Sequence, residues 1–394
     1  MKIVQYLRRF CPLSETFIYG LVTGLQRVES GTRVLSMERI NSDIYPFDPV
    51  DMHPLVTSPR TRDLLRIAPS IQPLIHRLPV DRGGSVAVRL QGYFRQVQAD
   101  VVHAHFGNSA VDIADSCAAV GIPLVVSLRG YDASRLVKKR SWRWRYRWAF
   151  RRAGAVIVVS KEMRDRISYL VPRRTPIYVI HAGKDPANYP ARPPPGKITR
   201  VLSVGRLVEK KGHADAIRAI GYARSLGADV SLRIIGDGPL YGELAALIER
   251  EGLADHVSLS GPLPHDLVVN AMGEADAVVL ACCTAPDGDM EGVPNVLKEA
   301  QLLGRPVIAT RHAGTPEVMP VKNHGWLAAE GDWRHLGTLL RALVDVDRAV
   351  LAAQLERGRA HVVKEFSAAE EVARHLRLYE GLVRRRSRPK TVGK

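Results

Sequence analysis

The chain has 394 residues, of which 46% are hydrophobic and 25% are charged, and its net charge is +17. This composition is typical of a globular protein and argues against a disordered or membrane-spanning chain, while the length favours two domains. The excess of cations predicts attraction to a polyanion, whether nucleic acid, anionic lipid or a phosphorylated substrate.

The first residues predict a strand, not a targeting signal. A short apolar run after Met1 becomes charged within a few residues and lacks the apolar region and cleavage site of a secretory signal. No apolar run approaches the roughly 20 residues of a transmembrane helix. We therefore expect a cytoplasmic protein whose cysteines are reduced core residues, since their spacing fits no zinc site. These cysteines are Cys11, Cys117, Cys282 and Cys283.

Short runs rich in valine and isoleucine alternate with longer helical patterns, which predicts βα units and a parallel sheet. In the first half, strands are expected near residues 2–7, 33–37, 100–104, 123–128, 155–160 and 177–181. In the second half they are expected near residues 200–204, 231–235, 257–260, 277–280 and 306–309. The two sets indicate two successive α/β domains, with a cleft between them as the natural place for a substrate.

A proline-rich segment separates the two sets. Residues 186–196 contain five prolines, which cannot sustain a helix or a central strand and favour an extended connection. The predicted domains are therefore 1–187 and 197–365. Residues 366–394 have helical apolar spacing as far as Leu382 and then a basic tail, so we expect a C-terminal helix that can pack back on the first domain.

The most informative segment of the second half runs from Glu291 to Ala300, with the sequence EGVPNVLKEA. Pro294 is well placed as the first residue of a helix, where its missing N–H costs nothing. The unpaired N–H groups of that helix start predict a diphosphate site, which Gly292 lets a ligand approach closely. Glu291 and Glu299, in the second helical turn, would bracket the ligand, one on sugar hydroxyls and the other on ribose hydroxyls. An ordinary surface loop before an amphipathic helix would give the same letters.

Two cations follow the first strand of the same half. A glycine turn begins at Gly205, and Arg206 and Lys211 are spaced so that both can reach one diphosphate. Arginine supplies a bidentate fork and lysine a point charge, which suits a leaving group on which negative charge grows. Taken alone, both are equally compatible with solvated loop residues. The next strand ends at Gly236-Asp237-Gly238, whose glycine spacing misses the G-x-G-x-x-G dinucleotide pattern and argues against an NAD enzyme.

Together these segments resemble the retaining family 4 glycosyltransferases of GT-B fold, particularly those of exopolysaccharide biosynthesis. The similarity rests on G-R-L-x(3)-K-G, G-D-G-P and E-G-V-P-N-V-L-x-E-A in this order, followed by GRPVIAT at 304–310 and GTPEV at 314–318. It implies an α/β fold of two Rossmann-like domains facing each other across a cleft. It also implies transfer, with retention, from a nucleotide-diphosphate sugar, specifically a UDP-sugar, to an acceptor in polysaccharide or glycoconjugate biosynthesis.

The resemblance assigns a role to each residue of the motifs. The catalytic candidates are Arg206 and Lys211, which would hold the donor diphosphate, and Glu291, which would hold the donor sugar. Glu299 would bind the ribose. The remaining donor contacts would come from Gly205, Gly236, Gly292, Val293, Pro294, Asn295 and Val296.

The first half resembles the family less closely. The segment 12–18, which contains Ser14, looks like the loop after the first strand, and the segment around His103 and His105 resembles a strand-end histidine motif. Either imidazole can equally be packed at a strand end. We treat all three residues as candidates for the acceptor side or for the vicinity of the donor.

Residues 127–132, SLRGYD, align with a family segment in which a histidine beside the donor sugar often precedes the glycine. Here that position is Arg129, which stays protonated and cannot serve as a general base near neutral pH. A histidine-dependent step is therefore in question at this position. Arg129 and Asp132 are further candidates near the donor, with an electrostatic role near the phosphate open beside that of ordinary loop residues.

Residues 135–152 contain nine lysines and arginines, no acidic residue, and five aromatic side chains. This mixture suits an anionic membrane surface, and hence peripheral attachment at the inner face of the membrane. RNA binding by stacking is a rival, and a solvated helix with its aromatic side chains packed inward is another. The aromatic residues from Trp142 to Trp148 alternate with period 2, but the resemblance implies a helix, which we expect.

The expected chemistry needs neither a carboxylate pair nor a metal. The departing diphosphate can itself help to deprotonate the acceptor, so the protein contributes positioning and charge stabilisation. Arg206, Lys211 and the helix start at Pro294 can neutralise the diphosphate, and no D-x-D motif stands at the right place. We therefore expect no metal and no cofactor besides the nucleotide sugar, which is a co-substrate.

Two alternatives stay open at this point. A sugar-nucleotide epimerase or a phosphorolytic enzyme of the same fold would act on the donor without any acceptor. A basic nucleic-acid-binding protein would explain the charge but not the glycine turns, and its binding would depend steeply on salt and ignore changes at Lys211 or Glu299. We expect no nucleic-acid partner. The sequence names neither the donor sugar nor the acceptor.

Overall fold

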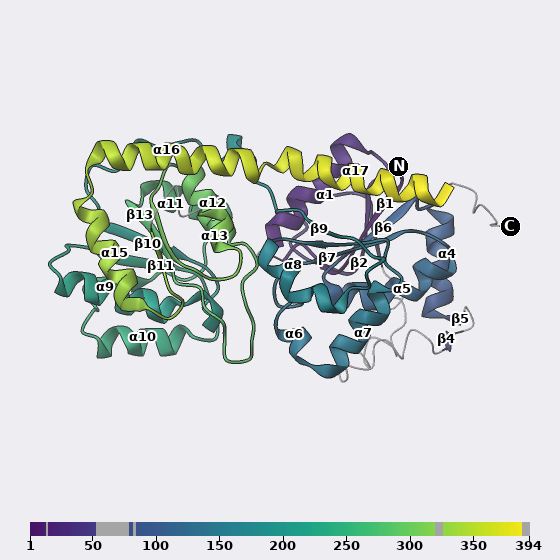
Figure 1. Cartoon of the computed structure of the whole chain (residues 1–394), viewed down its shortest axis with the longest axis horizontal. Helices are drawn as coiled ribbons and strands as arrows, with labels where there is room; N and C mark the ends of the chain where they lie inside the picture. The colour runs from purple at the N-terminus through teal and green to yellow at the C-terminus, as the bar shows by residue number, and fades with distance from the viewer. Residues whose placement is uncertain (13–14, 53–78, 82–83, 320–325, 388–394) are drawn as a thin grey trace. The chain divides into compact units, whose positions relative to one another are not determined.

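The computed structural model describes residues 1–12, 15–52, 79–81, 84–319 and 326–387. Ser14 and the end of the basic tail, from residue 388, lie outside the described residues. The chain divides into two compact units, one formed by Met1–Gly183 with Ala368–Lys394 and the other by Lys184–Ser367 (Figure 1). Each unit is built on one parallel sheet, so the predicted α/β fold with two Rossmann-like domains is confirmed.

The first unit contains a seven-stranded sheet in the order β3-β2-β1-β6-β7-β8-β9. Its parallel strands are β1 (Ile3–Phe10), β2 (Arg33–Arg39), β3 (Val50–Met52), β6 (Val101–His105), β7 (Leu124–Leu128), β8 (Ala155–Val158) and β9 (Ile177–Val179). All strands predicted in this half are confirmed, and the short edge strand β3 was missed. The central strands β6 and β7 are fully buried, as expected where helices cover both faces.

Helices follow the strands of this unit in chain order. They are α1 (Thr16–Val28), α4 (Val86–Gln96), α5 (Gly107–Ala119), α6 (Arg135–Lys138), α7 (Arg140–Phe150) and α8 (Lys161–Ile167), with a 3-10 turn at Ser168–Leu170. A small antiparallel pair, β4 (Pro79–Asp81) with β5 (Gly84–Ser85), precedes α4. The basic aromatic segment is therefore helical, as the resemblance implied.

The last helix of the chain belongs to the first unit. α17 (Ala368–Ser387) packs along α1, as Figure 1 shows. Its Leu378, Tyr379 and Leu382 join a core that also contains Ile3 and Val101 of the sheet. The end of the chain thus completes the hydrophobic core of the unit in which the chain begins.

The second unit contains a six-stranded sheet in the order β12-β11-β10-β13-β14-β15. Its parallel strands are β10 (Arg200–Val204), β11 (Ser231–Ile235), β12 (Val257–Leu259), β13 (Ala277–Leu280), β14 (Val307–Thr310) and β15 (Leu327–Ala328). Successive residues of a strand point to opposite faces. Val201 and Ile234 accordingly enter one core cluster, and their neighbours Leu202 and Ile235 enter the other. All strands predicted here are confirmed, and β15 was missed.

Helices cover both faces of this second sheet. They are α9 (His213–Ser225), α10 (Tyr241–Arg250), α11 (His265–Glu274), α12 (Asn295–Leu302), α13 (Thr315–Val318), α15 (Trp333–Asp345) and α16 (Arg348–Glu365). Short 3-10 turns occur at Pro186–Asn188 and Glu209–Lys211. α15 packs against α9 and α16 packs against α12. None of the described helices combines the length and apolar character that crossing a bilayer requires.

The chain enters and leaves the second unit at adjacent points. The Lys184 N–H donates to Phe366 O at 2.7 Å, and Lys184 forms a parallel bridge with Ser367. The proline-rich segment at 186–196 follows this point, so it belongs to the second unit. The four cysteines are free thiols, and burial raises the pKa of each.

Candidate active site

The motifs of the second half meet at one edge of the second sheet. In its strand order, the direction in which strands are added reverses between β10 and β13. Ligands of such open parallel sheets bind outside the carboxyl ends of the strands at this switch point. Arg206 follows β10, Gly236 follows β11 and the loop with Glu291 follows β13. The fold therefore brings three distant segments of the chain to the place where a ligand is expected.

Backbone hydrogen bonds join these loops. Leu207 N donates to Asp237 O at 2.9 Å, which ties the loop after β10 to the loop after β11. Cys283 N donates to Lys210 O at 3.1 Å, which ties the same loop to the one after β13. Main-chain hydrogen bonds thus help to fix the relative positions of the three loops.

Glycines allow this close approach. A Cβ on Gly236 would lie 1.9 Å from Gly205 O, and a Cβ on Gly212 would lie 1.7 Å from Ala281 O. Gly212 also has a φ of +65°, a left-handed conformation that favours glycine. At these positions the structure needs glycine because one loop touches another. This contact accounts for Gly236 without a ligand, and the predicted donor contacts of Gly205 and Gly236 stay a proposal.

Lys211 and Glu291 form an ion pair at the switch point. Lys211 Nζ lies 2.8 Å from Glu291 Oε2, and the two side chains are 14% and 19% exposed. Burial opposes charge on both groups, but Glu291 raises the pKa of Lys211, and Lys211 with Lys210 lowers the pKa of Glu291 to about 2. Both groups are therefore charged at neutral pH. An ammonium has three donors, so Lys211 can bind Glu291 and a phosphate oxygen at once.

A second set of contacts holds the loop that carries Glu291. The Glu291 N–H donates to His312 Nε2 at 3.1 Å, so His312 Nδ1 carries the proton and donates to Glu330 at 2.8 Å. Lys210 Nζ lies 3.2 Å from Asp289, in the same loop. The motifs did not point to His312, Glu330 or Asp289. The position of His312, three residues after a predicted strand of this sheet, was the signal that could have found it.

Arg206 is exposed at the same edge. Its charge lowers the pKa of Lys211, against the larger effect of Glu291, so the two cations are close enough to repel each other. An anion bound between them would relieve this repulsion. The two cations therefore suit a ligand with at least one phosphate group.

The helix start expected at Pro294 is found one residue later. α12 begins at Asn295, and Pro294 is its N-cap with φ −64° and ψ 119°. The prediction of Pro294 as the first helical residue was wrong by one position, because the extended ψ of Pro294 belongs to the loop. No side chain caps the helix, which leaves its first N–H groups for an anion. Val293 and Val296 pack against the core, so only their main chain is placed for a ligand.

Glu299 lies in the second turn of α12, as predicted, and is 4% exposed. Lys184 Nζ lies 2.5 Å from Glu299 Oε1, and Tyr189 Oη donates to the same oxygen at 3.3 Å. Burial would raise the pKa of Glu299, but the Lys184 ammonium outweighs it and the pKa lies below its ordinary value. The sequence did not point to either partner, because Lys184 and Tyr189 belong to no motif.

At the carboxyl edge of the first sheet, the candidate histidines are buried. The ring nitrogens of His103 lie 2.7 Å from Tyr379 Oη and 2.6 Å from Ser127 Oγ. His105 Nε2 lies 2.8 Å from Gln5 Oε1. Burial holds the pKa of both imidazoles well below the ordinary value, so both are neutral at pH 7.

The other first-half candidates lie beside these histidines. Arg129 Nη2 is 3.2 Å from His105 Nδ1, and the guanidinium lies 5.2 Å from the centre of the Phe17 ring. Asp132 accepts hydrogen bonds of 2.9 Å from the backbone N–H groups of residues 107, 129 and 130. Asp132 thus connects the loop after β7 to the start of α5. Ser14 lies outside the described residues.

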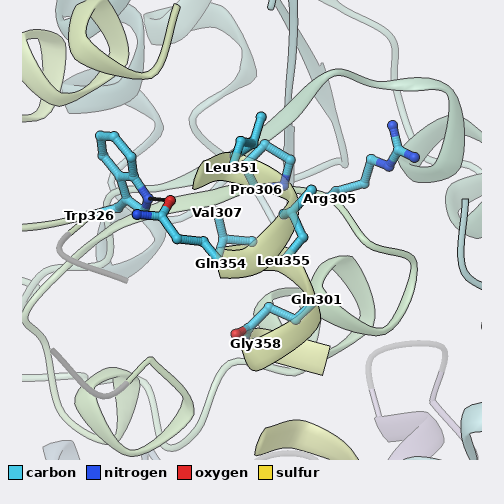
Figure 2. Close-up of a pocket in the computed structure, with 9 residues that line it drawn as sticks. All are labelled: Gln301, Arg305, Pro306, Val307, Trp326, Leu351, Gln354, Leu355 and Gly358. Atoms are coloured by element: carbon cyan, nitrogen blue, oxygen red, sulfur yellow. Dashed lines mark hydrogen bonds between the residues drawn. The ribbon is translucent and has the colours of Figure 1, made fainter. Parts of the chain in front are cut away.

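A cavity in the second unit lies away from the switch point (Figure 2). It adjoins Pro306 and Val307, at the amino end of β14, and faces α16, where Trp326 Nε1 donates to Gln354 Oε1 at 3.2 Å. Its volume of about 10 Å³ is close to the minimum for one water molecule. This cavity is too small for a sugar or a nucleotide.

The chemistry of the switch-point edge suits an anion. It combines Arg206, the Lys211–Glu291 pair and the uncapped start of α12. Within the described ranges, no group of three or more His, Cys, Asp or Glu side chains is placed to hold a metal ion. The residues at this edge can therefore bind a diphosphate with cations and N–H groups, while the ionised Glu291 accepts hydrogen bonds from hydroxyl groups.

Two family models match successive parts of the chain. Residues 15–188 match the model described as Glycosyltransferase Family 4, and residues 188–357 match the model described as Glycosyl transferases group 1. The chain is 33% identical over 274 residues to the colanic acid biosynthesis glycosyltransferase WcaL of Escherichia coli K12, with 68% of each chain covered. It is 33% identical over 278 residues to the amylovoran biosynthesis glycosyltransferase AmsK of Erwinia amylovora, covering 68% of this chain and 67% of that one.

Solved structures share the fold over nearly the whole chain. HepE of Anabaena, solved in complex with UDP, matches with a TM-score of 0.75 and 18% identity, over 97% of this chain and 100% of that one. Sucrose-phosphate synthase from Thermosynechococcus elongatus matches with a TM-score of 0.72 and 16% identity, over 98% of this chain and 100% of that one. At such identities the likeness shows the fold alone.

Proposed function

The chain belongs to the family 4 glycosyltransferases of GT-B fold, and from this premise we propose that it transfers a sugar from a UDP-sugar to a glycan acceptor in polysaccharide biosynthesis. The observation that carries the proposal is the Lys211–Glu291 ion pair, with Arg206 beside it, at the switch point of the second sheet. WcaL and AmsK are named for polysaccharide biosynthesis, and HepE was solved with UDP, which supports this class of donor and acceptor.

The cations would stabilise the leaving group. As the bond between sugar and diphosphate breaks, negative charge grows on the diphosphate oxygens, and cations already in place stabilise this charge most. Glu291 and burial hold Lys211 in position before the reaction. Arg206 would add a bidentate contact, and the first N–H groups of α12 would add partial positive charge.

Glu291 would bind the donor sugar. Its carboxylate is ionised, so it only accepts hydrogen bonds, and sugar hydroxyl groups are the matching donors. The hydrogen bond from its N–H to His312 fixes the main chain of the loop, which would orient the carboxylate. Glu299 would bind the ribose on the other side of the diphosphate.

We propose transfer with retention of the anomeric configuration. The acceptor oxygen would form its bond to the anomeric carbon on the face from which the diphosphate departs, and a departing phosphate oxygen would take the acceptor proton. This route needs no protein base. It is compatible with the first unit, where Arg129 stays protonated and His103 is fully buried.

We propose that the first unit binds the acceptor and that α7 contacts an anionic membrane surface. On α7, Tyr146 and Phe150 are buried, whereas Trp144 is 69% exposed. Arg145 lies 5.0 Å from the centre of the Trp142 ring. The helix therefore packs part of its aromatic set inward and presents an indole together with cations, a combination suited to lipid head groups. A lipid-linked glycan is the acceptor that this arrangement favours.

The direct test is a donor and acceptor screen on the full chain. UDP should raise the melting temperature more than other nucleoside diphosphates, because the ligand that binds the folded state most tightly stabilises it most. UDP-sugars that stabilise the protein are then incubated with lipid-linked and soluble glycan acceptors, and the anomeric configuration of the product is determined by NMR. Inverted product would contradict retention. Conversion of the sugar nucleotide without acceptor would indicate the epimerase instead.

Removing divalent metals tests whether protein cations, and not a metal ion, stabilise the charge on the diphosphate. If Arg206, Lys211 and the α12 N–H groups neutralise the diphosphate, turnover in EDTA should stay close to its level in buffer. The control is EDTA followed by excess Mg²⁺. A complete loss that Mg²⁺ or Mn²⁺ restores would assign this charge stabilisation to a metal ion.

A further inference from the structure

A buried ion pair joins Lys184 to Glu299 inside the second unit. Lys184 Nζ lies 2.5 Å from Glu299 Oε1, and the two side chains are only 8% and 5% exposed. Two charges withdrawn from water in this way depend on each other, because either one alone would bear the full cost of its burial. A change at Lys184 must therefore alter Glu299.

The main chain holds Lys184 in place independently of α12. Its N–H donates to Phe366 O at 2.7 Å, and it forms a bridge with Ser367, so its backbone is fixed by the segment that follows α16. Its ammonium also lies 5.8 Å from the centre of the Tyr189 ring, within the range of a cation–π contact. The ammonium is thus a fixed point against which the Glu299 side chain is positioned.

The two oxygens of the Glu299 carboxylate differ in their surroundings. In the part of the chain that the structure describes, the side-chain hydrogen bonds from Lys184 and Tyr189 both fall on Oε1. An ionised carboxylate can accept roughly four hydrogen bonds over its two oxygens. Oε2 therefore keeps acceptor capacity for a ligand, while Oε1 is engaged by the protein.

The chemistry of a ribose fits this division. A ribose presents two neighbouring hydroxyl groups, and both can donate to an ionised carboxylate. A neutral carboxylic acid would lose acceptor capacity on one oxygen and bind the pair less well. The charge of Lys184 also offsets that of Glu299, so a nearby diphosphate would meet less negative charge.

We propose that Lys184 is a positioning residue for nucleotide recognition, which engages Oε1 of Glu299 and thereby leaves Oε2 for the ribose hydroxyl groups of the donor. This inference rests on the proposed function, in which Glu299 binds the ribose. Lys184 itself would not touch the nucleotide. Its loss should therefore appear as a loss of preference for ribose hydroxyl groups and not as a general loss of nucleotide binding.

The experiment compares two ligands on five proteins by isothermal titration calorimetry. The ligands are the nucleoside diphosphate that binds wild-type protein most tightly among UDP, GDP and ADP, and its 2′,3′-dideoxy counterpart. The proteins are wild type, Lys184→Met, Lys184→Arg, Glu299→Gln and Lys197→Met. The last is a matched control, because Lys197 forms an exposed ion pair with Asp229 in the same unit.

Wild type and Lys197→Met should prefer the ribose form by about 10- to 100-fold, the range for a hydrogen bond to a charged group. Lys184→Met should lose most of this preference by binding the ribose form more weakly, with dideoxy binding unchanged. Lys184→Arg, which keeps the charge, should recover part of it. In Lys184→Met the preference should also return as the pH is raised and Glu299 loses its proton, whereas the wild-type preference should stay constant between pH 6 and pH 8.

The outcomes separate this inference from the proposed function. If Glu299→Gln keeps the full preference, or wild type has none, the ribose role of Glu299 is wrong and the inference fails with it. If Glu299→Gln loses the preference but Lys184→Met keeps it at every pH, only the inference is wrong. Should Lys184→Met unfold, as judged by circular dichroism, Lys184→Gln decides in its place, since it keeps a donor without the charge.

Discussion

The carboxyl edges of the two sheets share a topology but not a chemistry. Both sheets reverse their strand order at one point, between β1 and β6 in the first unit and between β10 and β13 in the second. In the second unit this edge carries the charged pair Lys211–Glu291. In the first, His103 and His105 are neutral, fully buried and bonded to other side chains. The topology supplies two equivalent edges, and their side chains make them chemically different.

The two edges also stabilise their loops by different means. In the second unit, glycine lets the loop after β10 touch the loops after β11 and β13. In the first unit, the Asp132 carboxylate holds the loop after β7 against the start of α5 by accepting three backbone hydrogen bonds. In the second unit these backbone contacts act together with the ion pairs of Lys210 and Lys211, whereas in the first unit one carboxylate binds three backbone N–H groups of its own edge.

Among the changes that test this comparison, Lys211→Met should have the largest effect on activity. Removing one preorganised cation from the anion-binding edge should lower kcat by about 10²- to 10³-fold, as in other sites that stabilise a growing negative charge. The substitution also leaves Glu291 without its partner in a buried site. Steady-state kinetics with a fixed acceptor measure the loss.

Lys211→Arg is the matched variant for this test, because it keeps the charge and changes the geometry. It should retain more activity than Lys211→Met. Circular dichroism and gel filtration check that both variants fold. Near-normal turnover of a folded Lys211→Met protein would remove Lys211 from the site and with it the main difference between the two edges.

The second prediction concerns Glu299, whose contacts are proposed to be the same in the ground state and the transition state. Glu299→Ala should raise the donor KM by about 10- to 100-fold, the range for a lost hydrogen bond to a charged group, and leave kcat nearly unchanged. A lower kcat with an unchanged donor KM would instead place Glu299 at the reacting centre.

Sequence alone predicted the elements whose signals are local. Every predicted strand is present, and the central strands β6, β7, β8, β13 and β14 are continuous, mostly apolar buried runs, whereas β3 and β15 are only three and two residues long. Arg206, Lys211 and Glu291 were found because glycine turns and a strand end accompany them in the sequence. The start of α12 was placed one residue early, since the dihedral angles of Pro294 depend on the loop before it.

The partners of these residues could not be predicted, because they come from elsewhere in the chain. Lys184 reaches Glu299 only after the chain has folded, and His312 reaches the Glu291 N–H in the same way. Neither partner belongs to a motif. The same limit applies to the first edge, where the role of Asp132 follows from three backbone groups that its spacing in the sequence does not reveal.

The third prediction compares how the stability of the two units depends on pH. His103, His105 and His375 of the first unit are buried, and burial holds each pKa below the ordinary value, to about 3 for His375. The unfolded chain therefore binds protons first on acidification. The contribution of these imidazoles to the free energy of unfolding is complete above about pH 6.5. Below that pH it falls by up to about 1.4 kcal/mol per pH unit for each imidazole.

In the second unit, His213 behaves in the same way: burial lowers its pKa to about 4, so its contribution to stability is lost from about pH 6.5 down to pH 4. Glu291, with a pKa of about 2, contributes stability above its ordinary pKa near 4.5 that is lost only as the pH falls toward 2. Among the described residues, burial lowers the pKa of three imidazoles in the first unit and of one in the second. Hydrogen exchange measured at pH 7 and pH 5 should therefore show the first unit losing protection before the second. His375→Gln should reduce this loss in the first unit, and earlier opening of the second unit would contradict the prediction.

The smallest effect expected concerns the cations of α7 and the adjacent Arg151 in the first unit. An anionic surface attracts each nearby lysine or arginine by on the order of 1 kcal/mol before screening, so several together can hold a protein without a spanning helix. Changing Arg143, Arg145, Arg147 and Arg151 together to glutamine should reduce sedimentation with anionic vesicles by about fivefold at low ionic strength, and salt should release the wild-type protein.

Changing the exposed residues Arg233, Arg250, Arg334 and Arg357 of the second unit removes the same charge and is the matched control, which should sediment nearly as wild type. Donor binding should survive the α7 changes, because the proposed donor site lies in the second unit. Equal losses in the two variants would show that net charge, not α7, draws the protein to the membrane, and wild-type protein that ignores anionic vesicles would favour a soluble acceptor.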